Sequence, residues 1–80
     1  MHYVYLLESI GSHGERYVGE TKDLRARLEE HNSGKSRHTS KFAPWRLVTY
    51  CAFSERAKAE AFERYLKSGS GHAFANKRLW

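Results

Sequence analysis

Hydrophobic and polar positions along the chain divide it into short segments of strand and helix character. Aromatic and branched side chains fill residues 2–8, and a shorter run of the same type covers residues 16–20. Turn-forming residues at 9–14 separate these runs, which predicts a hairpin. Gly19 is expected to end the second strand. A third run at residues 45–53 predicts another strand.

The first helix is expected between the second and third strands. Good helix formers cover residues 24–32, and Gly34 marks the end of the helix. Thr21 and Asp23 are both candidates for the cap, since either side-chain oxygen can accept a free backbone N–H. Residues 33–44 form a polar, basic loop.

Two further helical segments follow the third strand. A second helix is expected from a cap at Ser54 to about Lys67, where residues 68–71, a Ser-Gly-Ser-Gly run, are expected to break it. Residues 72–80 have a helical pattern. The order ββαβαα predicts one α/β domain of the α+β type over residues 1–80: a small three-stranded, mostly antiparallel sheet with helices packed on it.

Three polar side chains occupy helix faces that should be apolar. Positions i, i+3, i+4 and i+7 share one face of a helix. In the first helix, Arg27 and His31 complete the stripe that Leu24 and Leu28 begin. In the second helix, Glu63 falls within a stripe made of Ala59, Phe62 and Leu66. A buried charge is costly unless it is paired. One possibility is that Arg27 and Glu63 pair with each other, or extend their charged ends to the solvent at the edge of the sheet. The other is that Arg27, His31 and Glu63 line one cleft against the tyrosine-bearing sheet.

Three tyrosines on the hairpin add to this pattern. Tyr3 and Tyr5 share one face of the first strand because strand side chains alternate, and Tyr17 lies on the neighbouring strand. At least one of them is expected only to pack. An arginine fork matches two phosphate oxygens, and a lone carboxylate suits Mg²⁺. A tyrosine or histidine can transfer a proton to or from water. These are the parts of metal-assisted phosphodiester hydrolysis.

The charge of the chain favours a polyanionic partner. Fourteen Lys and Arg against nine Asp and Glu give a net charge of +5. Two groups of basic residues contain no acid: Lys35, Arg37, Lys41 and Arg46, with His38 among them, and Lys67, Lys77 and Arg78. Grouped basic charge of this kind is typical of nucleic-acid binding, although an ordinary solvated surface is the alternative.

Cysteine content and hydropathy predict a soluble, cytoplasmic protein. Cys51 is the single cysteine and is expected to be a small core residue. No Cys/His spacing resembles a zinc site. The apolar start of the chain is too short for a signal peptide, and no apolar run approaches membrane-spanning length, so no membrane contact is expected.

Two short motifs face each other across the hairpin: Tyr3-Val4-Tyr5 and Tyr17-Val18-Gly19. Arg27, His31 and Glu63 follow them in order. Together they resemble the GIY-YIG nuclease superfamily, and the chain is most similar to its small single-domain bacterial members, which are related to the N-terminal nuclease domain of the excision-repair excinuclease. Tyr3 stands where the name-giving glycine would be, a position that varies among the small members.

The resemblance implies a role for each matching position. Tyr5 would be the general base or would orient the attacking water, and Tyr17 would shape the site beside the scissile phosphate. Arg27 would stabilise charge on that phosphate, and His31 would contact a proton or the phosphate. Glu63 would hold the single metal ion, Mg²⁺ or Mn²⁺.

The sequence therefore predicts a metal-dependent endonuclease that hydrolyses phosphodiester bonds in DNA, with structured or damaged DNA as one candidate substrate and DNA repair as one setting. Asn76 lies near the position of a supporting asparagine. Phe42 and Trp45 are candidates for stacking on an unpaired base, with core packing as the alternative for Trp45. The residues expected to contact the nucleic acid are Lys35, Arg37, His38, Lys41 and Arg78.

No attached recognition domain is expected, so specificity must come from the loop at residues 35–45, from the C-terminal basic segment, or from a protein partner. Two other functions fit the same residues. One is a nucleic-acid-binding module that recognises branched or damaged DNA with weak or no cleavage. The other is a structural or protein-interaction role in which the charges on the apolar stripes are merely paired.

Overall fold

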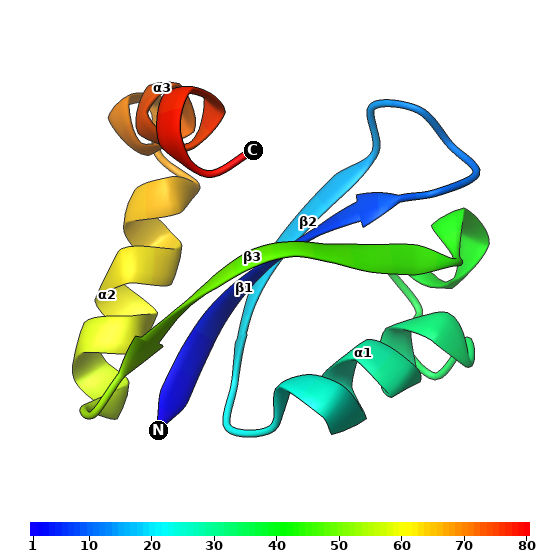
Figure 1. Ribbon diagram of the computed structural model, residues 1–80, viewed down its shortest axis with the longest axis horizontal. Helices are drawn as coiled ribbons and strands as arrows, with labels where there is room; N and C mark the ends of the chain where they lie inside the picture. Colours follow the sequence, from blue (N-terminus) through cyan, green and yellow to red (C-terminus); the bar gives the residue numbers. More distant parts are fainter.

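The computed structural model describes all 80 residues. It has the order ββαβαα (Figure 1). The strands are β1 His2–Ser9, β2 Arg16–Thr21 and β3 Trp45–Phe53. They form one antiparallel sheet in the order β2-β1-β3. The helices are α1 Leu24–Asn32, α2 Arg56–Leu66 and α3 Gly69–Arg78, and a short 3-10 helix, Ser40–Phe42, lies in the loop before β3. The predicted fold class is confirmed.

The helices cover opposite faces of the sheet, with α1 on one side and α2 and α3 on the other (Figure 1). Side chains of the central strand β1 alternate between the two faces. Val4 and Leu6 point toward α2 and α3, and they pack with Ala59, Leu66 and Ala75. Tyr5 and Leu7 point toward α1, and they pack with Trp45, Leu24 and Leu28. Burial of each large apolar side chain contributes roughly 1.5–3 kcal/mol, so β1 is the main support of both cores.

The bounds of α1 are those predicted, and the structure selects its cap. The Asp23 side chain accepts a hydrogen bond from the Ala26 N–H at 3.1 Å. Thr21 instead accepts from the Asp23 N–H at 3.1 Å, which holds the capping residue in place. Gly34 follows the helix with a φ of +83°, a backbone conformation that favours glycine.

Three predicted segment ends are wrong. Gly19 does not end β2 but is buried within it, opposite Tyr5. Ser54 does not cap α2, because the helix begins one residue later than expected and Glu55 holds the cap position without a side-chain bond. The small residues after α2 start α3 instead of forming a long break. The Ser68 hydroxyl accepts from the Gly71 N–H at 3.2 Å and caps that helix.

Cys51 lies half-buried on β3, and burial raises the pKa of its thiol. The sequence predicts Cys51 to be a core residue, but the structure leaves it partly exposed. None of the helices is long and apolar enough to cross a membrane.

Candidate active site

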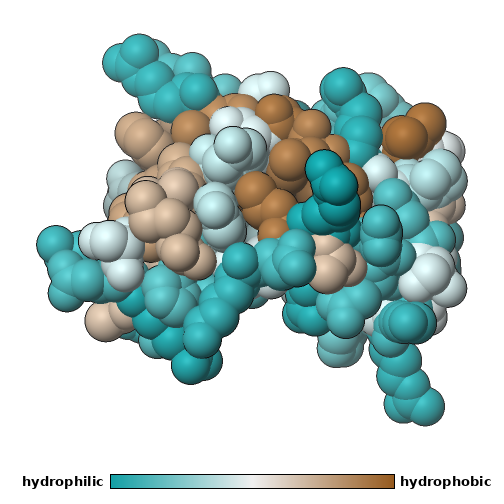
Figure 2. Space-filling view, turned by 60° about the horizontal axis from the view of Figure 1, so that its bottom comes forward, coloured by the Kyte–Doolittle hydropathy of each residue, from teal (hydrophilic) through white to brown (hydrophobic).

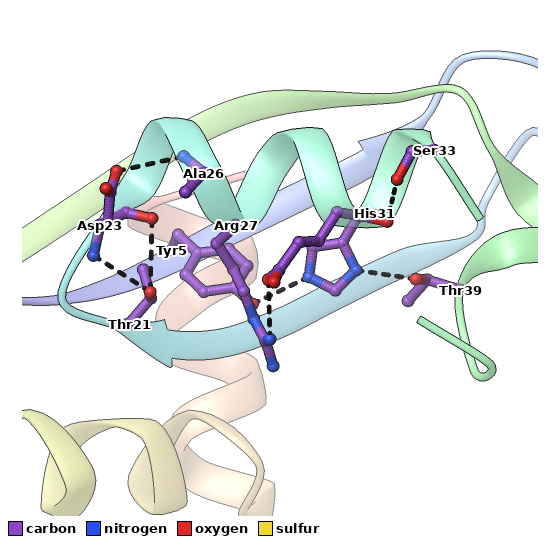
Figure 3. A network of polar contacts seen from close by, with 9 residues as sticks. Tyr5, Thr21, Asp23, Ala26, Arg27, His31, Ser33 and Thr39 are labelled. Carbon is purple, nitrogen blue, oxygen red and sulfur yellow. Dashed lines mark hydrogen bonds and ion pairs between the residues drawn. The ribbon is translucent and has the colours of Figure 1, made fainter. Parts of the chain in front are cut away.

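A continuous set of polar contacts joins β1, α1 and the loop that follows α1 (Figure 3). The Tyr5 phenol and His31 Nε2 are 2.9 Å apart, and His31 Nδ1 lies 2.7 Å from the Thr39 hydroxyl. Arg27 Nε donates to the Tyr5 oxygen at 3.3 Å. Tyr5, His31 and Thr39 are buried, whereas the Arg27 side chain is 42% exposed. The contacts hold a cation and two proton-transfer groups at one point.

Periodicity along α1 explains why these groups meet. Arg27 and His31 are four residues apart, so they share the helix face that Leu24 and Leu28 pack against the sheet. Both polar side chains project from α1 toward Tyr5 (Figure 3). The predicted position of Arg27 and His31 against the tyrosine-bearing face is confirmed.

Gly19 provides the space that Tyr5 occupies. A methyl group at this position would lie 2.5 Å from the Tyr5 hydroxyl oxygen and 2.9 Å from the Tyr17 ring. The Tyr17 ring centroid lies 6.2 Å from that of Tyr5 and 4.9 Å from that of His31. The glycine of the second motif therefore allows the two tyrosines and the histidine to gather on one side of β2.

Gly19→Ala is expected to destabilise the fold by about 1–3 kcal/mol, because the new methyl group must displace a buried ring. Displacement of Tyr5 would also break its 2.9 Å contact with His31. Denaturant unfolding measures the first effect. Gly11→Ala is the matched control, since nothing lies within 4 Å of an added methyl group there. Equal unfolding free energies for the two variants would show that the close approach at Gly19 is relieved without cost.

The protonation states in this cluster follow from burial and from Arg27. Burial raises the pKa of Tyr5 to about 12, against the lowering effect of the Arg27 hydrogen bond, and the Glu63 carboxylate adds a smaller rise. Burial and the Arg27 charge both lower the pKa of His31. Hydrogen bonds to Tyr5 and Glu30 raise the already high pKa of Arg27. At neutral pH Tyr5 is therefore a protonated donor, His31 is neutral and Arg27 is charged.

Stability is expected to fall with decreasing pH because of His31. Its folded pKa lies below the ordinary value of 6.5, so the unfolded chain binds more protons as pH falls. The contribution is fully present above pH 6.5 and is lost as pH falls toward the folded pKa. Unfolding free energies measured across this range for the wild type and His31→Gln test it. The variant should show a shallower slope; parallel slopes would assign the pH dependence to other groups.

Glu63 lies on α2, whose apolar stripe packs on the face of the sheet opposite to α1. The three polar groups therefore do not share one sheet face, because α1 and α2 cover different faces. The pairing of Arg27 with Glu63 is also absent: Arg27 bonds Glu30 at 3.0 Å, and Lys67 Nζ bonds Glu63 at 2.9 Å. The Glu63 carboxylate is nevertheless close enough to act on the Tyr5 pKa.

The side chains near the cluster fit a metal ion that needs few protein ligands. No three or more His, Cys, Asp or Glu side chains gather to hold a metal. Two half-buried carboxylates lie near the cluster: Glu30, which is paired with Arg27, and Glu63, the less exposed of the two. One carboxylate such as Glu63 fits Mg²⁺ or Mn²⁺, since Mg²⁺ keeps several waters and is completed by phosphate oxygens of a substrate. It does not resemble a structural zinc site, which needs four protein ligands.

Thr39 is a member of the cluster that the sequence pattern does not reveal. It is buried in the basic loop, bonds His31 through its hydroxyl, and accepts from Trp45 Nε1 through its carbonyl at 2.8 Å. A threonine among serines and lysines carries no periodic signal, so only the fold identifies it. Trp45 is 3% exposed, which confirms core packing rather than base stacking. Phe42 is half-buried and lies edge-on to Trp45.

Thr39 also places the basic loop beside the cluster. The four loop residues that are expected to contact nucleic acid are all exposed: Lys35, Arg37, His38 and Lys41. Hydrophilic side chains project from the rim of the molecule in Figure 2, around hydrophobic residues gathered near its middle. The anchored loop can therefore present its cations to a polyanion that reaches Tyr5.

The remaining predicted residues lie apart from the Tyr5–His31 contacts. Tyr3 packs edge-on against Tyr50, with ring centroids 5.7 Å apart, which agrees with the expectation that at least one of the three tyrosines packs. Asn76 lies on α3, where its side-chain oxygen accepts from Arg16 at 3.1 Å. Arg78 is exposed in the last turn of α3.

Comparison with known proteins places the chain in a family. The family model of the GIY-YIG catalytic domain matches residues 1–77. The chain is similar to a UPF0213 protein of Cupriavidus pinatubonensis, with 37% identity over 79 residues, covering 94% of this chain and 86% of that protein. A UPF0213 protein of Haloquadratum walsbyi is 37% identical over 68 residues, covering 84% and 74%. The chain belongs to the GIY-YIG family of nuclease domains.

Two further similarities extend this assignment. The structure-specific endonuclease subunit SLX1 of Ajellomyces capsulatus is 40% identical over 65 residues, which cover 74% of this chain but 15% of that protein. The solution NMR structure of the UPF0213 protein BH0048 from Bacillus halodurans matches with a TM-score of 0.57 and 33% identity, covering 98% of this chain and 85% of that one. The fold is thus shared with a solved member of the UPF0213 proteins.

Proposed function

We propose that this protein is a metal-dependent endonuclease that hydrolyses phosphodiester bonds in DNA in the cytoplasm. The supporting observation is the meeting of Arg27 and His31 on the oxygen of Tyr5. In that arrangement Arg27 is a cation that can bind a phosphate, and Tyr5 and His31 are a pair of groups that can transfer a proton. The similarity to SLX1, a structure-specific endonuclease subunit, adds support for structured DNA as substrate and for work with a protein partner.

The proton steps follow from the pKa directions. With a pKa of about 12, Tyr5 supplies almost no phenolate at neutral pH, so it cannot act alone as the base. Its proton can pass to His31 Nε2 while its oxygen takes a proton from the attacking water. This relay needs the tautomer in which Nδ1 carries the proton and donates to the Thr39 hydroxyl. The lowered pKa of His31 keeps the imidazole neutral and able to accept.

Arg27 stabilises the negative charge that grows on the phosphate during the attack. Its Nε and Nη1 make bonds to Tyr5 and Glu30. A guanidinium has five N–H donors in a fixed fork, so others remain for phosphate oxygens. Because the site is partly shielded from water, such preorganised donors are worth more than they would be in bulk solvent.

Glu63 is the residue that would hold the metal ion, with Tyr17 shaping the neighbouring wall. When bound, a Mg²⁺ or Mn²⁺ ion supplies a Lewis acid for the phosphate and stabilises the leaving oxygen. Lys67 Nζ now bonds this carboxylate at 2.9 Å and would release it to make room for the ion. The Lys67 ammonium would then be available to bond a phosphate oxygen.

The basic residues of the loop and of α3 contact the DNA backbone in this proposal: Lys35, Arg37, Lys41 and Arg78, with His38 among them. Contacts of this type carry no sequence information and make binding sensitive to salt.

Incubation with supercoiled plasmid and Mg²⁺ or Mn²⁺ tests the proposal. The wild type should nick the plasmid, whereas Glu63→Ala and Arg27→Ala should nick it far more slowly. The same background nicking in all three proteins would refute the enzymatic function. Salt-dependent DNA binding without metal-dependent nicking would favour the binding module for branched or damaged DNA instead.

A further inference from the structure

A pocket of about 400 Å³ opens at the edge strand β2, between that strand and helices α2 and α3. Six of its lining side chains are polar or aromatic: Arg16, Tyr17, Lys67, His72, Asn76 and Trp80. Its floor is apolar and includes Leu66. No acidic side chain lines it. A concave site with an apolar floor and a few converging polar groups is the usual form of a small-ligand site.

The pocket touches the candidate active site on two sides. Tyr17 lines the pocket, and the centroid of its ring also lies 4.9 Å from that of the His31 ring. Lys67 lines the pocket and bonds Glu63, the proposed metal-holding residue. A strand with its scissile phosphate near Tyr5 therefore passes directly beside this opening.

Two flat groups, the Arg16 guanidinium and the Trp80 indole, form one wall of the pocket. The Arg16 guanidinium lies 4.6 Å from the centre of the Trp80 ring and donates to the Asn76 side-chain oxygen. That bond leaves the N–H groups of the Asn76 amide free to donate. Flat guanidinium and indole surfaces are the groups on which unpaired bases stack, and Lys67 and His72 add donors for phosphate.

We propose that this pocket binds one unpaired nucleotide of the substrate strand, next to the phosphate that is cut. The inference rests on the proposed nuclease function and adds to it a substrate class: DNA with an unpaired or extruded base. A volume of about 400 Å³ suits one nucleotide. A base held in a duplex must first be unstacked, at a cost of a few kcal/mol, so paired DNA is disfavoured.

Tryptophan fluorescence tests the proposal without any cleavage. The wild type is titrated, in the absence of divalent metal, with a single-stranded thymidine oligomer and with an abasic oligomer of the same length. The thymidine oligomer should quench the emission, because its bases stack on the Trp80 wall, and the abasic oligomer should not. Trp80→Phe should show no quenching, since the remaining Trp45 is buried in the core.

Binding of labelled oligomers, followed by anisotropy, gives the size of the effect. Trp80→Ala should weaken binding of the thymidine oligomer by about 5- to 150-fold and leave the abasic oligomer unchanged, as base stacking contributes about 1–3 kcal/mol. Quenching of equal depth by both oligomers, or by neither, would overturn the nucleotide pocket. Plasmid nicking is scored separately: nicking without base-dependent quenching removes this inference alone, and quenching without nicking removes the nuclease function alone.

Discussion

Arg27→Ala is expected to lower the rate of metal-dependent plasmid nicking by roughly 100- to 1,000-fold, the usual cost of losing one preorganised charge-stabilising donor. Arg27 is the only cation bonded to the Tyr5 oxygen. Its side chain is 42% exposed, so the truncation leaves no buried cavity and the protein should remain folded. Rates at saturating DNA, with thermal unfolding beside them, separate catalysis from stability.

Arg25→Ala is the matched control for this prediction. Arg25 belongs to the same helix, is exposed, and makes no side-chain hydrogen bond or ion pair. Its loss should weaken DNA binding slightly, with little change in the rate at saturation. Arg27→Lys should recover only part of the activity, since an ammonium keeps the charge but not the fork. Equal rate losses for Arg25→Ala and Arg27→Ala would reduce the role of Arg27 to general positive charge.

Among the glycine-to-alanine substitutions, Gly71→Ala should cause the largest loss of stability. An added methyl group at Gly71 would lie 1.6 Å from the Tyr65 carbonyl oxygen and 2.8 Å from the Leu66 Cα. These are backbone atoms at the end of α2, so they cannot move aside as a side chain can. A loss of about 3 kcal/mol or more is expected. For a domain of this size, it would lower the Tm by at least about 12 °C.

Gly69→Ala provides the comparison, because it adds the same methyl group to the same first turn of α3. Nothing lies within 4 Å of a methyl group at Gly69, so the variant should be neutral or slightly more stable through a less flexible unfolded chain. Thermal and denaturant unfolding of the two variants measure the difference. A Gly71→Ala protein with the stability of wild type would mean that α3 can shift on α2 without cost.

The two predictions test different parts of the fold. Arg27 lies on α1, above the tyrosine-bearing face of the sheet, whereas Gly71 sets the approach of α3 to α2 on the other face. Arg27→Ala should lose nicking with unchanged stability, whereas Gly71→Ala should lose stability. This result would show that Arg27 acts in the candidate site and that Gly71 acts in the packing of the helices.

Local patterns along the sequence were enough to predict the three strands, the bounds of α1 and the sharing of one helix face by Arg27 and His31. Each of these depends on residues only a few positions apart, through side-chain alternation in strands and the 3.6-residue turn of helices. The motif set likewise indicates the GIY-YIG family without any knowledge of the fold.

Tertiary structure decided what depends on contacts between distant residues. Thr39 reaches His31 across a loop, and Gly19 makes room for Tyr5 across two strands. Glu63 belongs to a helix on the opposite sheet face and bonds Lys67 rather than Arg27. The pattern of one helix shows which side is buried, but not the face of the sheet against which it is buried. The sequence by itself therefore determined the order of strands and helices and the family, while the packing of α1 and α2 on opposite faces determined which of the candidate site residues meet.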